Sequence, residues 1–247
     1  MGDVHDQIQA FWDRDSHTYD DSASHAISDP LEASAWRAAL LRALPERGAK
    51  VLDAGAGTGA LSLLAAELGY EVTALDLSEG MLSKARAKSE ASGVGVTFVV
   101  GPADEPPAGP FDAIMERHVV WTMPDPVKVL RAWLEVMAPG GRLVLFEGLW
   151  GADTPAQVAK DRAAEVLRRV LGVQDHHHAP YPADVLAQLP LAEITSPVPL
   201  IEMVREAGWH GLRIQRLRDV EWAAMQHDPW PLGWLEARAR YALIADA

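Results

Sequence analysis

The residues best suited to chemistry begin with a stretch of alternating glycines behind an acid. Asp53, Gly55, Gly57 and Gly59 follow a short apolar run and precede a helix-like apolar segment. Glycine tolerates positive φ and lets a ligand approach the backbone, and the start of a helix leaves N–H groups that can face the ligand. The pattern predicts a strand, a turn and a helix that bind an adenosine-containing ligand at one corner of a doubly wound α/β sheet.

A second acid, Asp76, ends the next apolar run. An acid at the end of this strand can accept hydrogen bonds from the hydroxyls of a ribose, and its alternative role is to cap a helix. Asp76 therefore supports the adenosine half of the ligand without identifying the other half. Because Gly55, Gly57 and Ala60 also fit the loose dinucleotide fingerprint, an NAD-dependent oxidoreductase is one alternative.

The full motif favours another cofactor. Residues 53–59 read acid, Ala, Gly, Ala, Gly, Thr, Gly, which resembles the first motif of the class I S-adenosylmethionine-dependent methyltransferases. A Pro-Gly-Gly turn at 139–141 before an apolar run is similar to a recurrent feature of that family. The resemblance is strong over 50–148 and weak over 200–247. It implies S-adenosylmethionine as cofactor and S-adenosylhomocysteine as product.

The resemblance also implies contacts to the cofactor. Around the turn, Asp53, Ala54, Gly55 and Gly57 would lie near its amino-acid end, where a carboxylate can pair with the ammonium group. Asp76 would hold the ribose. The remaining contacts are Leu77 and Met81 beside the adenine, Ala103 and Asp104 at its ring, and Tyr19 from an N-terminal segment that closes over the cofactor. Plain core packing is the alternative for Met81, and docking of the N-terminal segment is the alternative for Tyr19.

Three consecutive polar residues, Glu116, Arg117 and His118, leave the predicted fourth strand. Ligands of open parallel sheets bind beyond the carboxyl ends of strands, so these residues belong to the transfer site. We expect Glu116 to contact the cofactor. His118 suits proton removal near neutral pH, and its alternative is a packed core histidine. Arg117 could anchor an acceptor carboxylate or phenolate, or form a salt bridge with a neighbour such as Glu116.

A run of three histidines, 176–178, follows an amphipathic segment. We include His177 as a third catalytic candidate because a histidine here could contact the acceptor; a solvated loop is the alternative. No defined set of further ligands accompanies the run, so the sequence predicts no metal site. Tryptophans at predicted loops and element ends could line a pocket for a flat acceptor or seal the cap: Trp12, Trp121, Trp150, Trp222 and Trp230.

The elements that must position these residues follow from apolar periodicity. Strands are predicted at 50–54, 71–76, 96–100, 111–118, within 138–146, at 212–222 and at 238–245. Helices are predicted at 30–44, 61–68, 127–137, 156–171 and 199–207. This order predicts an α/β, Rossmann-like, seven-stranded and mostly parallel sheet with an antiparallel final strand. We expect one methyltransferase domain over 1–247, with an N-terminal lid (1–30), a cofactor-binding core (31–148), a substrate cap (149–199) and the C-terminal end of the core (200–247).

Composition limits the partners. The net charge is −13 and no continuous basic segment is visible, so we expect no nucleic-acid substrate. No apolar run approaches the roughly 20 residues that span a bilayer, and the first residues do not resemble a signal peptide, so no membrane partner is expected. The chain has no cysteine, which excludes disulfides and thiolate metal sites and is compatible with the cytoplasm. The oligomeric state is left open.

These observations predict methyl transfer from S-adenosylmethionine to an O, N or C nucleophile of a small molecule. The acidic composition, the tryptophans and the variable cap favour a specialised metabolite as acceptor. Besides the NAD-dependent oxidoreductase, a second alternative is a non-catalytic or repurposed protein that binds the adenosyl cofactor.

Overall fold

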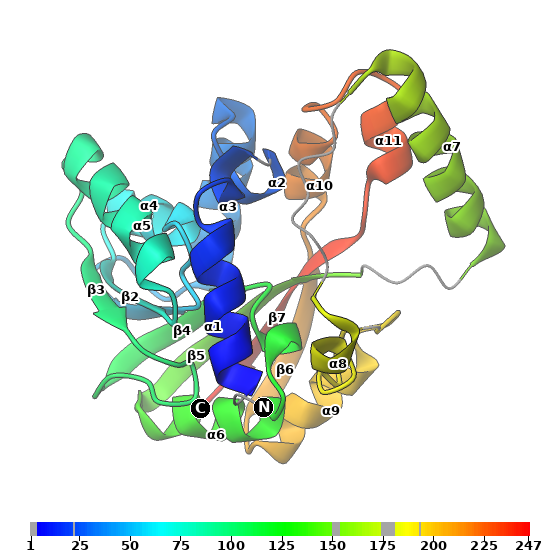
Figure 1. Cartoon of the computed structure of the whole chain (residues 1–247). Coiled ribbons are helices and arrows are strands. Elements are labelled where there is room, and N and C mark those ends of the chain that lie inside the picture. Colours follow the sequence, from blue (N-terminus) through cyan, green and yellow to red (C-terminus); the bar gives the residue numbers. More distant parts are fainter. Residues whose placement is uncertain (1–3, 22, 150–153, 174–180, 193) are drawn as a thin grey trace.

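The computed structural model describes residues 4–21, 23–149, 154–173, 181–192 and 194–247. Its centre is one seven-stranded sheet with the strand order β3-β2-β1-β4-β5-β7-β6 (Figure 1). The strands are β1 (Lys50–Ala54), β2 (Glu71–Asp76), β3 (Thr97–Val100), β4 (Phe111–Arg117), β5 (Met137–Gly148), β6 (His210–Arg216) and β7 (Arg240–Asp246). Strands β1 to β5 pair in parallel, and β7 is antiparallel to both neighbours. The predicted α/β class and sheet are confirmed.

The described residues also form helices, some of which cover the two faces of this sheet. They are α1 (Val4–Asp15), α2 (Ala23–Ala26), α3 (Pro30–Ala43), α4 (Ala60–Glu67), α5 (Glu79–Ser92), α6 (Pro126–Glu135), α7 (Pro155–Leu171), α8 (Ala183–Leu186), α9 (Val198–Glu206), α10 (Arg218–Ala224) and α11 (Leu232–Glu236), with 3-10 turns η1 (Tyr19–Asp21) and η2 (Val120–Thr122). Helices α3, α4 and α10 pack on one face around Trp36 and Phe146. Helices α6 and α9 pack on the other around Trp133, below the sheet in Figure 1.

The C-terminal part corrects two predictions. The strand predicted at 212–222 ends at Arg216, and α10 follows it. Val220 and Ala223 are buried three residues apart, which is the spacing of a helix face and not of a strand. The final strand, predicted at 238–245, begins two residues later, as β7 over Arg240–Asp246.

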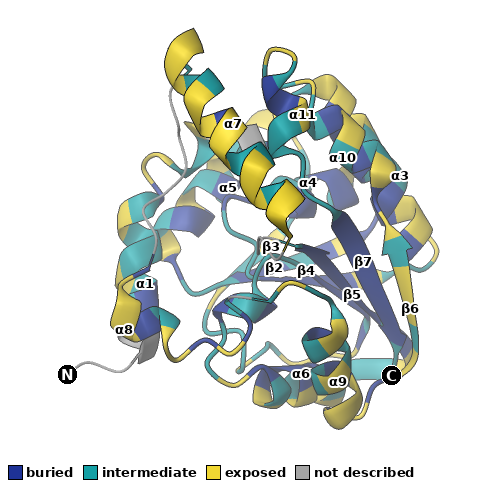
Figure 2. Ribbon diagram, turned by 90° about the vertical axis from the view of Figure 1, so that its right-hand side faces the viewer, coloured by how far each residue is buried: buried dark blue, intermediate teal, exposed yellow. Residues whose placement is uncertain are grey.

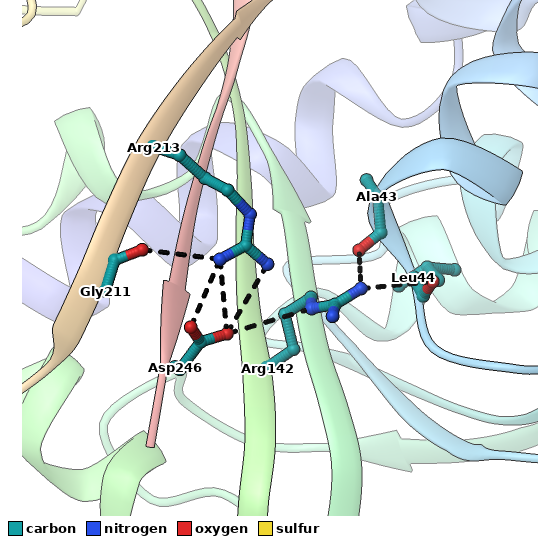
Figure 3. A network of polar contacts seen from close by, with 6 residues as sticks. All are labelled: Ala43, Leu44, Arg142, Gly211, Arg213 and Asp246. Atoms are coloured by element: carbon teal, nitrogen blue, oxygen red, sulfur yellow. Dashed lines mark hydrogen bonds and ion pairs between the residues drawn. The ribbon is translucent and has the colours of Figure 1, made fainter.

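A cluster of charged side chains joins the three strands at the antiparallel edge (Figure 3). Asp246 of β7 lies 3.1 Å from Arg213 of β6 and 3.9 Å from Arg142 of β5. Arg142 also donates to the carbonyl of Ala43, 3.0 Å away, at the end of α3. This network fastens the last hairpin to the parallel part of the sheet.

Helices α7 and α11 pack against each other away from the sheet (Figures 1 and 2). Arg168 of α7 pairs with Glu236 of α11, and the ammonium of Lys160 lies 3.9 Å from the ring centre of Trp234. Within α7, Ala164 is buried and most other side chains are exposed. The helix predicted at 156–171 is confirmed by α7, which spans Pro155–Leu171.

Candidate active site

A cavity opens beyond the carboxyl ends of β1, β2 and β4. The empty space within it, open solvent included, is about 790 Å³. Several predicted site residues line it: Tyr19, Gly55, Gly57, Asp76, Leu77, Met81, Ala103, Arg117 and His118. The chain therefore brings most of the predicted site together at the sheet edge where parallel sheets bind ligands.

The other predicted residues lie elsewhere. Asp53, Ala54 and Glu116 are buried behind the cavity wall. The carboxylate of Asp104 forms an ion pair with Lys128 of α6, 2.7 Å away, and does not line the cavity. His177 lies outside the residues that the structure describes.

The glycine turn forms one wall of the cavity. The amide of Gly55 donates to the carbonyl of Leu75 at 2.7 Å, which holds the turn against the end of β2. Gly55 has φ +72°, and a Cβ added there would lie 2.3 Å from Val119 Cγ2. Since Val119 also lines the cavity, only glycine lets the turn and the loop after β4 approach this closely.

Asp76 faces the cavity with a carboxylate that the backbone already orients. It accepts hydrogen bonds from the amides of Gly57 at 2.7 Å and Ser78 at 2.8 Å. Burial raises its pKa to about 6, against the lowering effect of these bonds. A carboxylate oxygen can accept more than one hydrogen bond, so Asp76 can also receive the hydroxyls of a ribose.

Asp53 has a different environment. It is 2% exposed, and its carboxylate accepts a 2.5 Å hydrogen bond from Ser62 of α4. Burial raises the pKa of Asp53 to about 6. Asp53, the acid of the motif, thus links β1 to α4 behind the turn. It is buried next to the glycine turn and does not line the cavity.

The N-terminal segment, α1 and η1, covers the turn and the start of α5. Asp13 accepts a 2.5 Å hydrogen bond from Ser78, the residue that caps α5. Asp20 accepts from Thr58 of the glycine turn at 2.7 Å and pairs with Lys88 of α5 at 2.8 Å. These contacts bring Tyr19 to the cavity wall.

Aromatic and apolar side chains form the wall on the side of α1. Ile8 and Trp12 of α1 line the cavity, together with Thr122 and Met123 from the loop after β4. Trp12 also packs edge-on against Tyr181, with ring centres 5.9 Å apart.

The other tryptophans named from the sequence have separate places. Trp121 packs in the cluster around Tyr181. Trp222 and Trp230 are exposed, and Trp150 lies outside the described residues. Of the four that the structure describes, Trp12 is the one that lines the cavity.

Arg117 and His118 leave β4 in different directions. Arg117 donates to the carbonyl of His25 at 2.7 Å, and its guanidinium lies 5.6 Å from the ring centre of Trp36. His118 has φ +61°, a region in which histidine is tolerated better than most residues. The turn holds the imidazole on the cavity wall, with Nδ1 3.3 Å from Glu147 Oε2.

The environment keeps His118 neutral at pH 7. Burial lowers its pKa well below the ordinary value, and the positive charges of Arg117 and Arg240 lower it further. A neutral imidazole can accept a proton on one nitrogen while the other is held by a hydrogen bond. The arrangement of His118 and Glu147 is thus suited to general-base chemistry.

Sequence reasoning missed Glu147 and Tyr241, which lie on β5 and β7 beside His118. Glu147 directly follows an apolar run near the end of its strand, as Asp76 does. An acid in that position was a signal that the sequence offered. Tyr241 gave no local signal because its place depends on β7 inserting next to β5.

Comparison with known proteins identifies the family. A family model described as a methyltransferase domain matches residues 52–145. The ubiquinone biosynthesis O-methyltransferase of Xanthomonas axonopodis pv. citri (strain 306) is 33% identical over 191 residues, which cover 76% of this chain and 70% of that protein. The chain belongs to the class I S-adenosylmethionine-dependent methyltransferases. The protein of the same name from Xanthomonas campestris pv. campestris (strain B100) is 37% identical over 158 residues, 62% of this chain and 64% of that protein.

Solved structures share the fold of this methyltransferase. Phosphoethanolamine N-methyltransferase 2 of Haemonchus contortus, in complex with S-adenosyl-L-methionine, aligns with a TM-score of 0.66 at 16% identity, over 100% of this chain and 60% of that one. The 4+2 cyclase SpnF aligns with a TM-score of 0.67 at 18% identity, over 99% and 97% of the two chains. At such identities the likeness concerns the fold alone.

The family membership confirms S-adenosylmethionine as the cofactor. The cavity fits it, since the turn at Gly55 has no room for a side chain and Asp76 presents an oriented carboxylate. Leu77 and Met81 add apolar surface suited to a purine. Among the described residues, no group of three or more His, Asp or Glu side chains is arranged to hold a metal ion.

Proposed function

We propose that this methyltransferase transfers the methyl group to a hydroxyl oxygen of a small molecule with an aromatic or apolar body. The observation that carries the proposal is a neutral His118 on the cavity wall, backed by the carboxyl of Glu147. An amine that is already neutral can attack without a base, whereas a hydroxyl gains most from proton removal.

We propose that the cofactor occupies the half of the cavity nearest the glycine turn. Asp76 would receive the ribose hydroxyls, Gly55 and Gly57 would line the path of the amino-acid end, and Leu77 and Met81 would contact the adenine. The positions of these residues on one wall support this arrangement. Tyr19 would close the site from the N-terminal segment, which we propose acts as a lid.

The acceptor would lie between His118 and the wall formed by Ile8, Trp12 and Met123. When bound, the cofactor supplies a methyl group on a positively charged sulfur. His118 would take the hydroxyl proton as the oxygen–carbon bond forms and the carbon–sulfur bond breaks, which leaves S-adenosylhomocysteine and a methyl ether. The protein otherwise aligns the two reactants and excludes water.

The relatives support oxygen as the accepting atom, since the two Xanthomonas proteins are named O-methyltransferases. The expectation of a specialised-metabolite acceptor stays a prediction, because the names of these relatives refer to ubiquinone biosynthesis. We also keep the single domain with a cap over 149–199 and the cytoplasm as proposals. No helix in the described ranges has the length and hydropathy to cross a membrane.

A repurposed protein is the second candidate function. The fold is compatible with it, since the 4+2 cyclase SpnF shares this fold over nearly the whole of both chains. It predicts binding of the adenosyl cofactor with no methylated product.

The test supplies S-adenosylmethionine labelled with 13C in its methyl group to the purified protein with phenols, catechols, amines and 1,3-dicarbonyl compounds. NMR of the product identifies the atom that carries the label. We expect a methyl ether, and a rate about 100- to 10,000-fold lower for His118→Asn. Asparagine tolerates positive φ, so this variant keeps the turn.

His210→Asn is the matched control, because His210 is exposed on β6. It should retain the full rate. A label on nitrogen or carbon, or an undiminished rate in His118→Asn, would refute the proposal. Cofactor binding without a product from any class of acceptor would favour the repurposed protein.

A further inference from the structure

Behind His118 lie two buried acids that the proposed methyl transfer does not yet use. In the register of β4 and β5, Glu116 is opposite Leu145. Side chains alternate along a strand, so Glu116 and Glu147 project from the same face of neighbouring strand ends. Tyr241 of β7 is paired with Glu147 and joins them on that face.

In each carboxyl, one oxygen has a polar partner and the other has no hydrogen-bond partner among the described residues. Glu116 accepts from the amides of Val119 at 2.6 Å and Val120 at 3.3 Å through Oε2, and Oε1 has no hydrogen bond. Glu147 faces His118 with Oε2, and its Oε1 is also without a partner. Glu116 is 0% exposed and Glu147 is 5% exposed.

Two full negative charges at this depth are unfavourable. Burial raises the pKa of both carboxyls, and the negative charge of Glu116 raises that of Glu147 further. One proton held between the two acids removes most of this cost, as in other buried pairs of carboxyls.

The surrounding charges are mixed. Arg117, Arg240 and His25 act on His118 with positive charge, and Asp53 acts on Glu116 with negative charge. Tyr241, paired with Glu147 across β5 and β7, stays protonated, because burial and both carboxylates raise its pKa. The groups around the acids that can exchange a proton near neutral pH are therefore the carboxyls themselves and Asp53, whose pKa burial raises to about 6.

We propose that Glu116 and Glu147 share one proton, and that its location decides which nitrogen of His118 carries hydrogen. With the proton on Glu116, ionised Glu147 accepts the Nδ1–H bond, and the other ring nitrogen carries no hydrogen and can act as a base. With the proton on Glu147, its O–H donates to Nδ1, and the other nitrogen carries hydrogen and cannot act as a base. Glu147 is then a positioning residue for the histidine.

A positive charge in the cavity favours the ionised form of Glu147. S-adenosylmethionine carries a sulfonium charge, and S-adenosylhomocysteine has a neutral thioether. His118 would therefore be able to act as a base when S-adenosylmethionine is bound, and would lose this ability when S-adenosylhomocysteine is bound. This inference rests on the proposed role of His118, but it can be tested without an acceptor.

The experiment follows the 15N chemical shifts of the His118 ring between about pH 5 and pH 9, a range that spans ordinary imidazole titration. The protein is labelled at histidine nitrogen and saturated with either S-adenosylmethionine or S-adenosylhomocysteine. The signals that vanish in His118→Asn belong to His118. As the pH rises and the acid pair releases its proton, leaving Glu147 ionised, we expect His118 to change from the form with hydrogen on the outer nitrogen to the Nδ1–H form in both complexes. The midpoint of this change should be about one pH unit lower for S-adenosylmethionine.

Variants assign the effect to the two acids. Glu147→Gln should abolish the pH-dependent tautomer change, and Glu116→Gln should lower its midpoint because the like charge is gone. Glu135→Gln, at the exposed end of α6, is the control and should leave the midpoint unchanged.

One tautomer of His118 throughout the pH range in both complexes would overturn the inference, and this comparison needs no substituted acid. A tautomer change that persists in Glu147→Gln would overturn it as well. If the change occurs as expected but no hydroxyl acceptor is methylated, the proposed function fails and the shared proton stands.

Discussion

At the scale of single residues, the charge state of Asp76 connects the structure to cofactor binding. Two backbone amides orient its carboxylate, and burial raises its pKa to about 6. Ribose hydroxyls donate to the ionised form, so binding favours that form and lowers the pKa of Asp76 from this raised value. Affinity for S-adenosylhomocysteine should therefore be full above the pKa of the free protein and fall as the pH drops through about 6.

Calorimetric titration of S-adenosylhomocysteine across this pH range measures the effect. At pH 8, Asp76→Asn should bind about 10- to 100-fold more weakly, the effect of losing a hydrogen bond to a charged group. The Asp76→Asn variant distinguishes the effect of Asp76 titration on affinity from that of Asp53, whose pKa is also raised to about 6. Asp112 lies near the amino end of β4 and does not line the cavity. Asp112→Asn should therefore bind S-adenosylhomocysteine as tightly as the wild type. Unchanged affinity in Asp76→Asn would exclude the ribose contact.

At the scale of elements, the site depends on how α1 and η1 are fastened to the turn and to α5. Asp20 joins Thr58 and Lys88, while Gln9 donates to the carbonyl of Leu77 at 3.1 Å. The segment carries Trp12 and Tyr19 into the cavity wall. Its contacts combine partly exposed polar pairs with a small apolar cluster around Ile8 and Tyr181, so it can open at lower cost than the large cores on the two faces of the sheet.

If the N-terminal segment acts as the proposed lid, Asp20→Asn should speed the release of S-adenosylhomocysteine several-fold, because it weakens the ion pair that joins η1 to Lys88 of α5. Stopped-flow measurement of the dissociation rate reports the change. Asp21→Asn carries the same substitution at the neighbouring exposed residue and should leave the rate as in the wild type. Equal rates in all three proteins would mean that Asp20 does not hold a lid.

The sequence predicted elements well where the signal was local. The glycine turn and Asp76 could be placed because a motif and a strand end lie within a few residues of each other. The position of Glu147 against His118 requires the pairing of β5 with β4, and Tyr241 requires β7 as the next strand. The helix α10 was read as strand because the spacing of apolar residues changes at Leu217, where β6 has already ended.

At the scale of the whole molecule, two polar networks fasten distant parts of the chain, and they differ in burial. Glu32 of α3 is 0% exposed and lies 3.2 Å from His227 and 3.7 Å from Arg240 of β7. Its Oε1 also accepts from Trp36 at 3.2 Å. The network around Asp246 lies at the exposed edge of the sheet, where solvent screens the charges.

Glu32→Gln should lower the free energy of unfolding by about 3 kcal/mol or more, since it leaves the buried guanidinium of Arg240 without this counter-charge. Asp246→Asn should cost about 1 kcal/mol or less, because its side chain is 36% exposed. Urea unfolding at neutral pH compares the two. Equal losses would show that burial does not decide the strength of these networks.

The central claim is that one cavity places the methyl donor and His118 on either side of the acceptor. A crystal structure of the protein with S-adenosylhomocysteine tests it most directly. We expect the ribose hydroxyls on Asp76 and the sulfur facing His118 across a gap that accommodates an acceptor oxygen. A sulfur directed away from His118, or a ligand bound outside the cavity between the glycine turn and the loop after β4, would contradict the account.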